Sequence, residues 1–539
     1  MKNVDNWKIG LINSIGGLNL MRKRESKRSE LILAILFATA SLISGCGSKE
    51  PAKDMPGTTE QVGATHLPSQ KDLAQVELVY YFPSPPQKDL QAINEELNRL
   101  IKPKINATVK LNMIDLGNYD QKMNFMIASG EPFDLAFTST WINNYFQNAS
   151  KGAYVAIDEL LDKYGPQTKA GVPAHIWNAA KVNGKLYGAI NYQVMATSYG
   201  FDVQKELADK YHFDWKNAKT FEDLEPFLNA VKKGETNKIP LEYSKTGDIF
   251  VGAPPLYGFD IIGDQRMPGW VRLNDKDLKV VDQYDTSEFK KLIAQSRKWY
   301  EKEYFRKDAA TTKEIAADRK AARYVMAMPA YQTLDSTEDS FSSGGLKAIT
   351  GVEWYRKRIT KPIITTDRAA ATITAISRTS KNPERAMMFL ELMNSDPQVA
   401  NLLNFGIEGK HYKKISDTRI ERIKDSGYDP NFPWVFGNNL ILWKTENDAS
   451  DATEKWDQLN KTSDLSPILG FTFNTEAVKS EIAQCQVVID QYLSALTTGT
   501  ADPDKIQPEF IDELKKSGVD KVITEKQKQL DEWRKANGK

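Results

Sequence analysis

The sequence predicts an α/β fold with at least two lobes, and two observations lead to this prediction. From Val76 onward, short apolar strands alternate with stretches of helical periodicity in a β-α-β-α-β pattern, which is typical of a parallel sheet with helical crossovers. In addition, about 490 residues remain after the N-terminal leader, and a chain of this length is usually too long for a single hydrophobic core.

Five elements make up this first pattern, between residues 76 and 138. We expect two strands and two helices in alternation, followed by a third strand. In order they are the apolar strand "VELVYYF", a helix with Leu90, Ile93, Leu97, Leu100 and Ile101 on one face, a strand with Val109, Leu111 and Met113 alternating, a helix carrying Met123, Met126 and Ile127, and the strand in "PFDLAFT".

Further along the chain, local signals predict turns and helix starts. Asn183-Gly184 in "KVNGKLYGAI" predicts a hairpin, because a type I′ turn needs positive φ at both central residues. A strand is expected at 371–376, followed by two helices in which an N-cap residue precedes proline at the first helical position. Those N-cap residues are Asn382 and Asp396. The C-terminal tail, from Pro508 to Trp533, also has an amphipathic helical pattern.

The N-terminus has the layout of a lipoprotein signal peptide. Basic residues after Met21 precede the apolar stretch Leu31 to Ile43, whose thirteen residues fall short of the roughly 20 that span a bilayer. We therefore expect translation to begin at Met21, with residues 1–20 as upstream sequence. Ile43-Ser44-Gly45-Cys46 resembles a bacterial lipobox, which implies that residues 1–45 are an extension and signal peptide and that Cys46 carries lipid.

Residues 46–71 then form a flexible tether, because they contain too few apolar residues to pack.

Without residues 1–45 the chain has 65 basic and 68 acidic residues, so its charge gives no sign of a nucleic-acid partner. Cys46 and Cys485 are the two cysteines of the chain. If Cys46 is lipidated, no internal disulfide can form, and the helical spacing of apolar residues around Cys485 predicts a buried structural thiol.

The sequence lacks the common motifs of hydrolases, metal enzymes and nucleotide-binding proteins, and the 68 acidic residues after residue 45 are too many for paired carboxylates to be informative about glycoside cleavage. Neither an HExxH nor a GxSxG motif occurs, and "GIEGK" lacks the residues of a phosphate loop, so Gly406 and Gly409 are interpreted as a turn. The histidines are far apart in sequence, at His66, His175, His212 and His411. We therefore expect no catalytic residues, no metal site and no cofactor.

Carbohydrate binding fits the residue types better. Sugars present apolar faces that pack on aromatic rings, and hydroxyls that need planar polar partners on loops. Trp141 directly follows a predicted strand, and ligands of parallel sheets bind outside the carboxyl ends of the strands. The candidate ligand-binding residues are Ser139, Trp141, Asn191, Tyr192, Gln193, Tyr331, Gln332, Trp434, Phe436 and Asn438.

Three segments resemble the extracellular solute-binding lipoproteins of ABC sugar importers, specifically the LplA-like group of oligosaccharide receptors. They are "GEPFDLAFT", "SPILGFTF" and "ISRTSKNPERAMMFLELMNSDPQVANLLNFGIEGKHY", and the likeness extends over nearly all of 76–539. The resemblance implies a two-lobed, periplasmic-binding-protein-like fold of type II. Each lobe has a central sheet flanked by helices, and the ligand cleft lies between the lobes.

On this resemblance, lobe 1 covers residues 72–190 with a return segment at about 365–405, and lobe 2 covers 191–364. Residues 406–539 form a family-specific region that completes lobe 2. The chain crosses between the lobes near residues 189–191, 367–371 and 405–409.

The implied function is that of a monomeric receptor, anchored by lipid on the extracytoplasmic face of the cell membrane. It captures a carbohydrate, expected to be an oligosaccharide, and delivers it to the permease subunits of an ABC importer. Two alternatives stay open at this point, a cell-surface glycosidase and a receptor of the same fold for peptides or other solutes.

Overall fold

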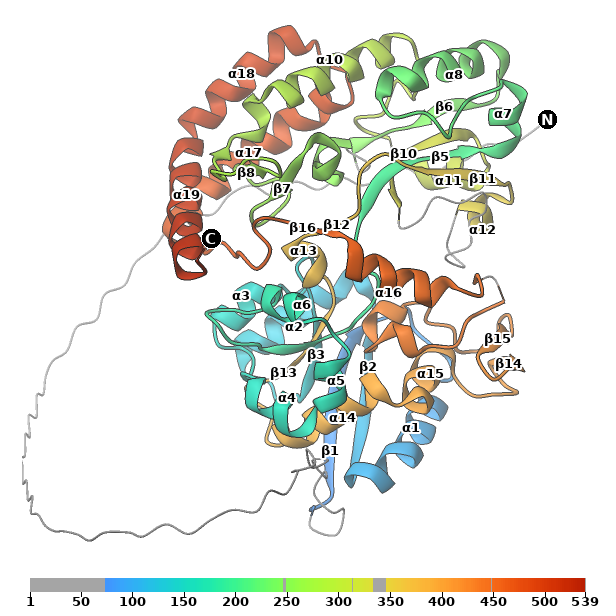
Figure 1. The fold of residues 1–539 in the computed structure, drawn as a ribbon, viewed down its shortest axis with the longest axis vertical. Coiled ribbons are helices and arrows are strands. Elements are labelled where there is room, and N and C mark those ends of the chain that lie inside the picture. The colour runs from blue at the N-terminus through green and yellow to red at the C-terminus, as the bar shows by residue number, and fades with distance from the viewer. Residues whose placement is uncertain (1–72, 246–248, 313, 333–345, 447, 539) are drawn as a thin grey trace, which may run out of the picture. The chain divides into compact units, whose positions relative to one another are not determined.

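The structure, a computed structural model, describes residues 73–245, 249–312, 314–332, 346–446 and 448–538. The start at Met21, the signal peptide, Cys46 and the whole tether lie outside the described residues. Most of the buried apolar side chains belong to two hydrophobic cores, which we call the first core and the second core. Each core includes residues of its own sheet, and Figure 1 shows the two sheets as separate groups of strands with helices around them.

The first core is built on a five-stranded sheet that confirms the predicted parallel pattern. β1 pairs in parallel with β2 along its whole length and with β3 on its other side, whereas β13 runs antiparallel to β3 and β4. The strands, in spatial order, are β2 (Ala107–Ile114), β1 (Val76–Pro83), β3 (Leu135–Thr138), β13 (Ile373–Ile376) and β4 (Gly188–Ile190).

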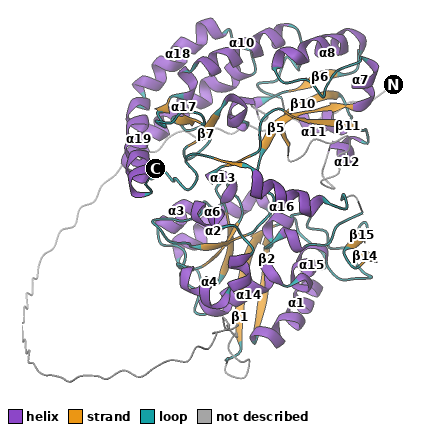
Figure 2. Ribbon diagram, viewed as in Figure 1, coloured by secondary structure: helices purple, strands orange, loops and turns teal. Residues whose placement is uncertain are grey.

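Helices flank this sheet (Figure 2). The apolar face predicted for the first helix is confirmed, because Ile93, Leu97 and Ile101 are all buried. The helices whose residues enter the first core are α1 (Leu90–Ile105), α2 (Leu116–Ser129), α3 (Tyr145–Ser150), α4 (Asp158–Tyr164), α6 (Ala174–Ala179), α13 (Thr366–Ala369), α14 (Pro383–Ser395) and α15 (Pro397–Phe405). α16 (Ala452–Thr462) packs at the border of this core, and α5 (Pro166–Ala170) packs against α14 and α4.

The second core is built on a four-stranded mixed sheet. β5 pairs antiparallel with both β10 and β11, and β10 pairs in parallel with β6. The strands, in spatial order, are β11 (Trp354–Arg358), β5 (Ser198–Gln204), β10 (Tyr324–Gln332) and β6 (Ile239–Glu242). A smaller antiparallel sheet contains β7 (Phe259–Ile261), β8 (Trp270–Arg272) and β9 (Val280–Val281).

The C-terminal helices pack on this second core. α17 and α18 lie beside α10, although about 200 residues separate them along the chain (Figure 1). The helices of this part are α7 (Lys205–Lys210), α8 (Phe221–Gly234), α9 (Ile249–Gly252), α10 (Ser287–Glu301), α11 (Ile315–Lys320), α12 (Leu346–Thr350), α17 (Lys479–Thr497), α18 (Pro503–Lys516) and α19 (Val519–Ala536).

The chain passes between the two cores at three places. Residues up to Ala196 pack in the first core and Phe201 packs in the second. The return occurs just before β12 (Ile363–Ile364), which pairs in parallel with β16 (Asp464–Leu465) at the third passage. Thr197 also bridges to Ile363, so the three passages lie side by side.

The segment between residues 406 and 436 contributes to the first core. Its β14 (Tyr412–Ser416) and β15 (Arg419–Arg422) form a hairpin, and Tyr428, Val435 and Phe436 are buried with the first core. This packing favours grouping the segment with lobe 1 instead of lobe 2, and the exact lobe boundaries stay a prediction.

Local signals in the sequence were partly right. The Asp396 carboxylate accepts the N–H groups of Gln398 and Val399, as predicted for an N-cap, but Asn382 makes no such bond and that prediction is wrong. Asn382 has ψ of 51°, whereas Asp396 has ψ of 109°, and capping side chains reach the first turn from extended backbone. The tail is two helices broken at Gly518, where φ is 92°.

Other expectations concerned single residues. Asn183 and Gly184 have φ of 50° and 81° and are bracketed by a Val182–Lys185 bridge, which confirms the turn. Cys485 is buried on α17, as predicted.

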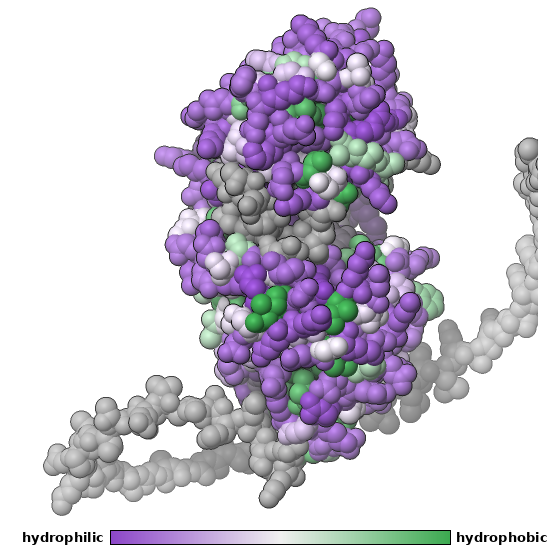
Figure 3. Space-filling view, turned by 90° about the vertical axis from the view of Figure 1, so that its right-hand side faces the viewer, coloured by the Kyte–Doolittle hydropathy of each residue, from purple (hydrophilic) through white to green (hydrophobic). Residues whose placement is uncertain are grey.

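On the face drawn in Figure 3, hydrophilic side chains predominate and hydrophobic ones form small separate patches. None of the helices within the described residues combines the length and apolar character needed to cross a membrane.

Candidate functional site

Trp141 lies at the carboxyl edge of the first sheet, just after β3. The Ser139 hydroxyl accepts the N–H groups of Trp141 at 3.2 Å and Ile142 at 2.8 Å, which fixes the turn that carries the indole. The indole Nε1 donates to the backbone oxygen of Ala371 at 3.0 Å, yet 52% of the residue stays exposed. Trp141 is therefore held firmly by hydrogen bonds and is still about half exposed to solvent.

Trp434 stands beside it on the short 3₁₀ helix Pro433–Val435. Its ring centroid lies 5.5 Å from that of Trp141, 5.3 Å from Phe137 and 4.9 Å from Phe432. Contacts of this kind orient aromatic rings in fixed geometries. The two tryptophans thus form one aromatic surface, although 293 positions separate them in the sequence.

Asn191, directly after β4, connects the segment that carries Trp434 to the first sheet. Its fully buried amide donates to the backbone oxygens of Val435 at 2.7 Å and Trp434 at 3.2 Å, and it accepts the Thr374 hydroxyl at 3.1 Å. Asn191 therefore fixes the backbone that carries Trp434 to β13. Gln193, partly exposed, donates to the Thr372 hydroxyl at 2.9 Å. We call Trp141, Trp434, Asn191, Gln193 and Thr372 the tryptophan edge.

The remaining predicted ligand-binding residues do not join this surface. Tyr192 and Phe436 are buried, and the Phe436 ring lies 4.9 Å from that of Phe82. The Asn438 side chain accepts the N–H of Leu440 at 2.9 Å.

Tyr331 and Gln332 belong to a different sheet from the tryptophan edge. Their backbone lies in β10, where it pairs with Tyr199 and Ser198 of β5. Their side chains lie outside the described residues. Whether these two residues reach a ligand stays a prediction.

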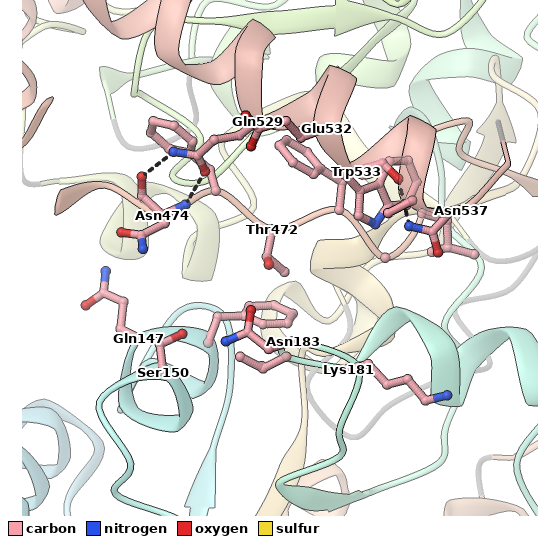
Figure 4. Close-up of a pocket in the computed structure, with 18 of the residues that line it drawn as sticks. Gln147, Ser150, Lys181, Asn183, Thr472, Asn474, Gln529, Glu532, Trp533 and Asn537 are labelled. Carbon is pink, nitrogen blue, oxygen red and sulfur yellow. Dashed lines mark hydrogen bonds between the residues drawn. The ribbon is translucent and has the colours of Figure 1, made fainter. Parts of the chain in front are cut away.

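A second feature is a groove of about 1490 Å³, which was not predicted from the sequence. One wall consists of α3, α6 and the turn at 181–184, and the other of residues 465–476 and α19. Figure 4 shows Gln147, Ser150 and Asn183 on one wall, opposite Thr472 and Trp533 on the other. We call this feature the carboxamide groove, because six asparagine and glutamine side chains line it.

Hydrogen bonds within the C-terminal wall fix its surface. Gln529 bonds twice to the backbone of Asn474, as acceptor and as donor, at 2.9 Å each (Figure 4). The Trp533 ring packs against Phe471 at 5.7 Å. Behind this wall the Lys526 ammonium is fully buried, 5.4 Å from the ring of Phe473, and burial lowers its pKa to about 7.

Sequence patterns could not indicate the groove, because its two walls come from segments almost 300 residues apart. Trp533 stands on the apolar face of a helical pattern, and Asn183 has the type of a turn residue. Nothing in either local pattern distinguishes a groove residue from a structural one. The described residues contain no group of three or more His, Cys, Asp or Glu side chains suited to a metal ion.

Comparison with known proteins identifies relatives. A carbohydrate ABC transporter substrate-binding protein of Streptococcus pneumoniae serotype 4 is 33% identical over 457 residues, which cover 83% of this chain and 89% of the relative. A model described as a domain of unknown function, DUF3502, matches residues 467–535.

Solved structures support the same relationship. A crystal structure of the N-glycan transport solute binding protein NgtS from S. pneumoniae matches with a TM-score of 0.76 at 30% identity, covering 86% of this chain and 99% of that one. NgtS in complex with Man5GlcNAc matches with a TM-score of 0.67 at 30% identity, with 86% and 99% covered. The alginate-binding protein AlgQ2, at 17% identity and a TM-score of 0.57, covers 85% of this chain and 98% of its own and shares the fold.

These matches confirm the predicted α/β solute-binding fold, now seen to contain several mixed sheets. They also decide between the classes of protein that the sequence left open, because the matched relatives are transport receptors and not enzymes. With 33% identity over most of both sequences, the chain belongs to the family of carbohydrate ABC transporter substrate-binding proteins, which act on the extracytoplasmic side of the membrane.

Proposed function

We propose that this receptor captures an oligosaccharide at the tryptophan edge and delivers it to the permease of an ABC importer. The observation that carries the proposal is the half-exposed indole of Trp141 beside Trp434. Apolar sugar faces stack on such rings, and the amide of Gln193 offers a donor and an acceptor next to them. The position outside the strand ends is the usual place for a ligand on a sheet of this kind.

We propose that the two lobes close around the ligand, which then lies between the two cores. The three passages between them, near residues 197, 363 and 464, pair with one another and form a natural hinge. A ligand favours the closed form only through contacts that it gains there, so it has to touch both lobes. The lobe limits of this proposal follow these three passages, so residues 406–436 belong to lobe 1 and the crossing expected near residues 405–409 is replaced by the one near residue 464.

For the ligand we propose the class bound by the relatives. NgtS has been solved with Man5GlcNAc, a mannose-rich glycan. We propose that this chain binds oligosaccharides of the same type, which fits two neighbouring stacking platforms better than a single sugar does.

Membrane attachment through Cys46 is also part of the proposal, as is membership of the LplA-like group. The lipobox-like sequence at 43–46 and the polar residues 47–71 support a lipid anchor followed by a tether. The receptor would then act as a monomer beside its permease.

The test is isothermal titration of the full chain in detergent with Man5GlcNAc. Trp141→Ala should weaken binding by about 1 to 3 kcal/mol, the scale of a lost aromatic contact, with little change in melting temperature. Phe125→Ala is the matched control, because Phe125 is 64% exposed on α2, outside the tryptophan edge. Unchanged affinity in Trp141→Ala would remove this residue from the site.

A further inference from the structure

We propose that the carboxamide groove is a second carbohydrate-binding site, separate from the tryptophan edge. Six carboxamide side chains line it, and a carboxamide can both donate to and accept from a sugar hydroxyl. They are Gln147, Asn178, Asn183, Asn474, Gln529 and Asn537.

The amides of the first wall are open to a ligand. Within the part of the chain that the structure describes, the side chains of Gln147, Asn178 and Asn183 make no hydrogen bond with other residues, and all three are exposed. Figure 4 shows Gln147 and Asn183 at the open space between the walls. A ligand with several hydroxyl groups could therefore bond to all three without displacing a protein partner.

The charges of the lining favour a neutral ligand. Three carboxylates, Glu476, Glu525 and Glu532, are matched by three ammonium groups, Lys151, Lys181 and Lys479. An anion such as a phosphate would normally be met by an excess of basic groups, and a cation by an excess of acidic ones. A balanced set of charges among many amides is suited to a polar ligand without charge.

Aromatic rings complete the chemistry of a sugar site. Trp533 and Phe473 line the C-terminal wall, opposite Phe146 on the first wall. Rings facing amides across an open groove are the combination on which sugar recognition depends. The volume of about 1490 Å³ exceeds the range of roughly 300–1,000 Å³ typical of small-molecule pockets, so an oligosaccharide fits better than a single sugar.

The site gives the C-terminal region a role of its own. Residues 467–535, which match the domain of unknown function, contribute most of one wall, and the other wall is built on the first core. None of the residues of the tryptophan edge lines the groove. The second site can therefore be removed without touching the first.

The experiment counts glycans bound per chain, using native mass spectrometry of the full chain with Man5GlcNAc as the probe. Two variants block the groove: Trp533→Ala removes a stacking ring, and Ser150→Trp fills space from an exposed position at the end of α3. Ser150→Trp is the safer variant, because Trp533 packs on Phe471 and its loss affects folding. Trp141→Ala serves as the counterpart at the tryptophan edge.

We expect two bound glycans on the wild-type chain and one on each variant. Ser150→Trp should leave the dissociation constant of the remaining site unchanged. A wild-type chain that binds at most one glycan, with the same affinity in Ser150→Trp, would overturn the groove site and leave the tryptophan edge intact. Binding that Ser150→Trp abolishes and Trp141→Ala does not affect would support the groove and overturn the tryptophan edge instead.

Discussion

Lys526 should make the stability of the folded chain depend on pH. Its Nζ, fully buried on α19, donates to the backbone oxygens of Ile262 at 2.6 Å and Gly269 at 3.0 Å. Burial lowers the pKa of Lys526 from 10.5 to about 7, although the charge of Asp264 acts in the opposite direction.

The sign and size of the effect follow from proton binding. Between pH 7 and pH 10.5 the unfolded chain holds a proton on Lys526 that the folded chain has largely lost, so the free energy of unfolding rises with pH. One proton corresponds to about 1.4 kcal/mol per pH unit. Because the folded state is still half protonated at pH 7, the gain between pH 7 and pH 9 is about 2 kcal/mol. Below pH 7 both states are protonated and the gain is absent.

Urea unfolding at pH 7 and pH 9 tests this reasoning with Lys526→Met, which removes the charge and keeps much of the side-chain length. The control is Lys528→Met, two positions along α19, whose side chain is 62% exposed. Lys526→Met leaves two backbone oxygens without a donor and lowers stability at both pH values. The informative quantity is therefore the change from pH 7 to pH 9, which should be about 2 kcal/mol smaller in Lys526→Met than in the wild type. Equal changes in both proteins would refute the argument.

Three other predictions address the anchor, the tryptophan edge and the hinge. Cys46→Ser should release the chain from membranes or leave it unprocessed, and fractionation that still finds it processed and membrane-bound would contradict the lipid anchor. Asn191→Ala should lower the melting temperature and weaken Man5GlcNAc binding, because it removes the two hydrogen bonds to the backbone oxygens of Trp434 and Val435. The loss of such buried bonds should lower the free energy of unfolding by about 1 to 3 kcal/mol. Unchanged affinity would show that Trp434 does not depend on these bonds. Beside the passage near residue 464, the Ser466 hydroxyl donates to the Asp260 carboxylate, and burial raises the pKa of Asp260 to about 7. Between about pH 4 and pH 7 the folded chain therefore keeps a proton that the unfolded chain has lost, so stability falls as pH rises. Burial raises the pKa of Asp282 to about 7 as well, so Asp260→Asn should lose less stability than the wild type over this range, and equal losses in thermal melts would contradict the prediction.

The first sheet was predictable because its order is local. Each strand and helix between residues 76 and 138 has the apolar periodicity of its own type, and the three parallel strands all come from this one short segment. β13 pairs antiparallel with β3 from more than 230 residues away, and the local sequence of β13 does not indicate this direction. Pairing between distant strands depends on the completed fold, which a periodic pattern does not report.

The candidate site was predictable only in part for the same reason. Trp141 could be placed because it directly follows a strand, whereas the distinction between Trp434 and Phe436 depends on which side of one short turn faces the core. Both are aromatic residues in the same "PWVFGNN" stretch, and one is buried. The carboxamide groove could not be foreseen, since exposed asparagine and glutamine residues are common on any surface.

The burial of Cys485 makes this chain suitable for site-specific labelling. Burial raises the pKa of its thiol to about 11, so almost none of it is in the reactive thiolate form at neutral pH. In the lipidated protein Cys46 would be blocked as well, and these two are the cysteines of the chain. Cysteines introduced at Ser150 and Glu532, on opposite walls of the groove, would therefore accept a donor and an acceptor dye with little background. Energy transfer between the two dyes could then follow the width of the groove in single molecules as glycan is added.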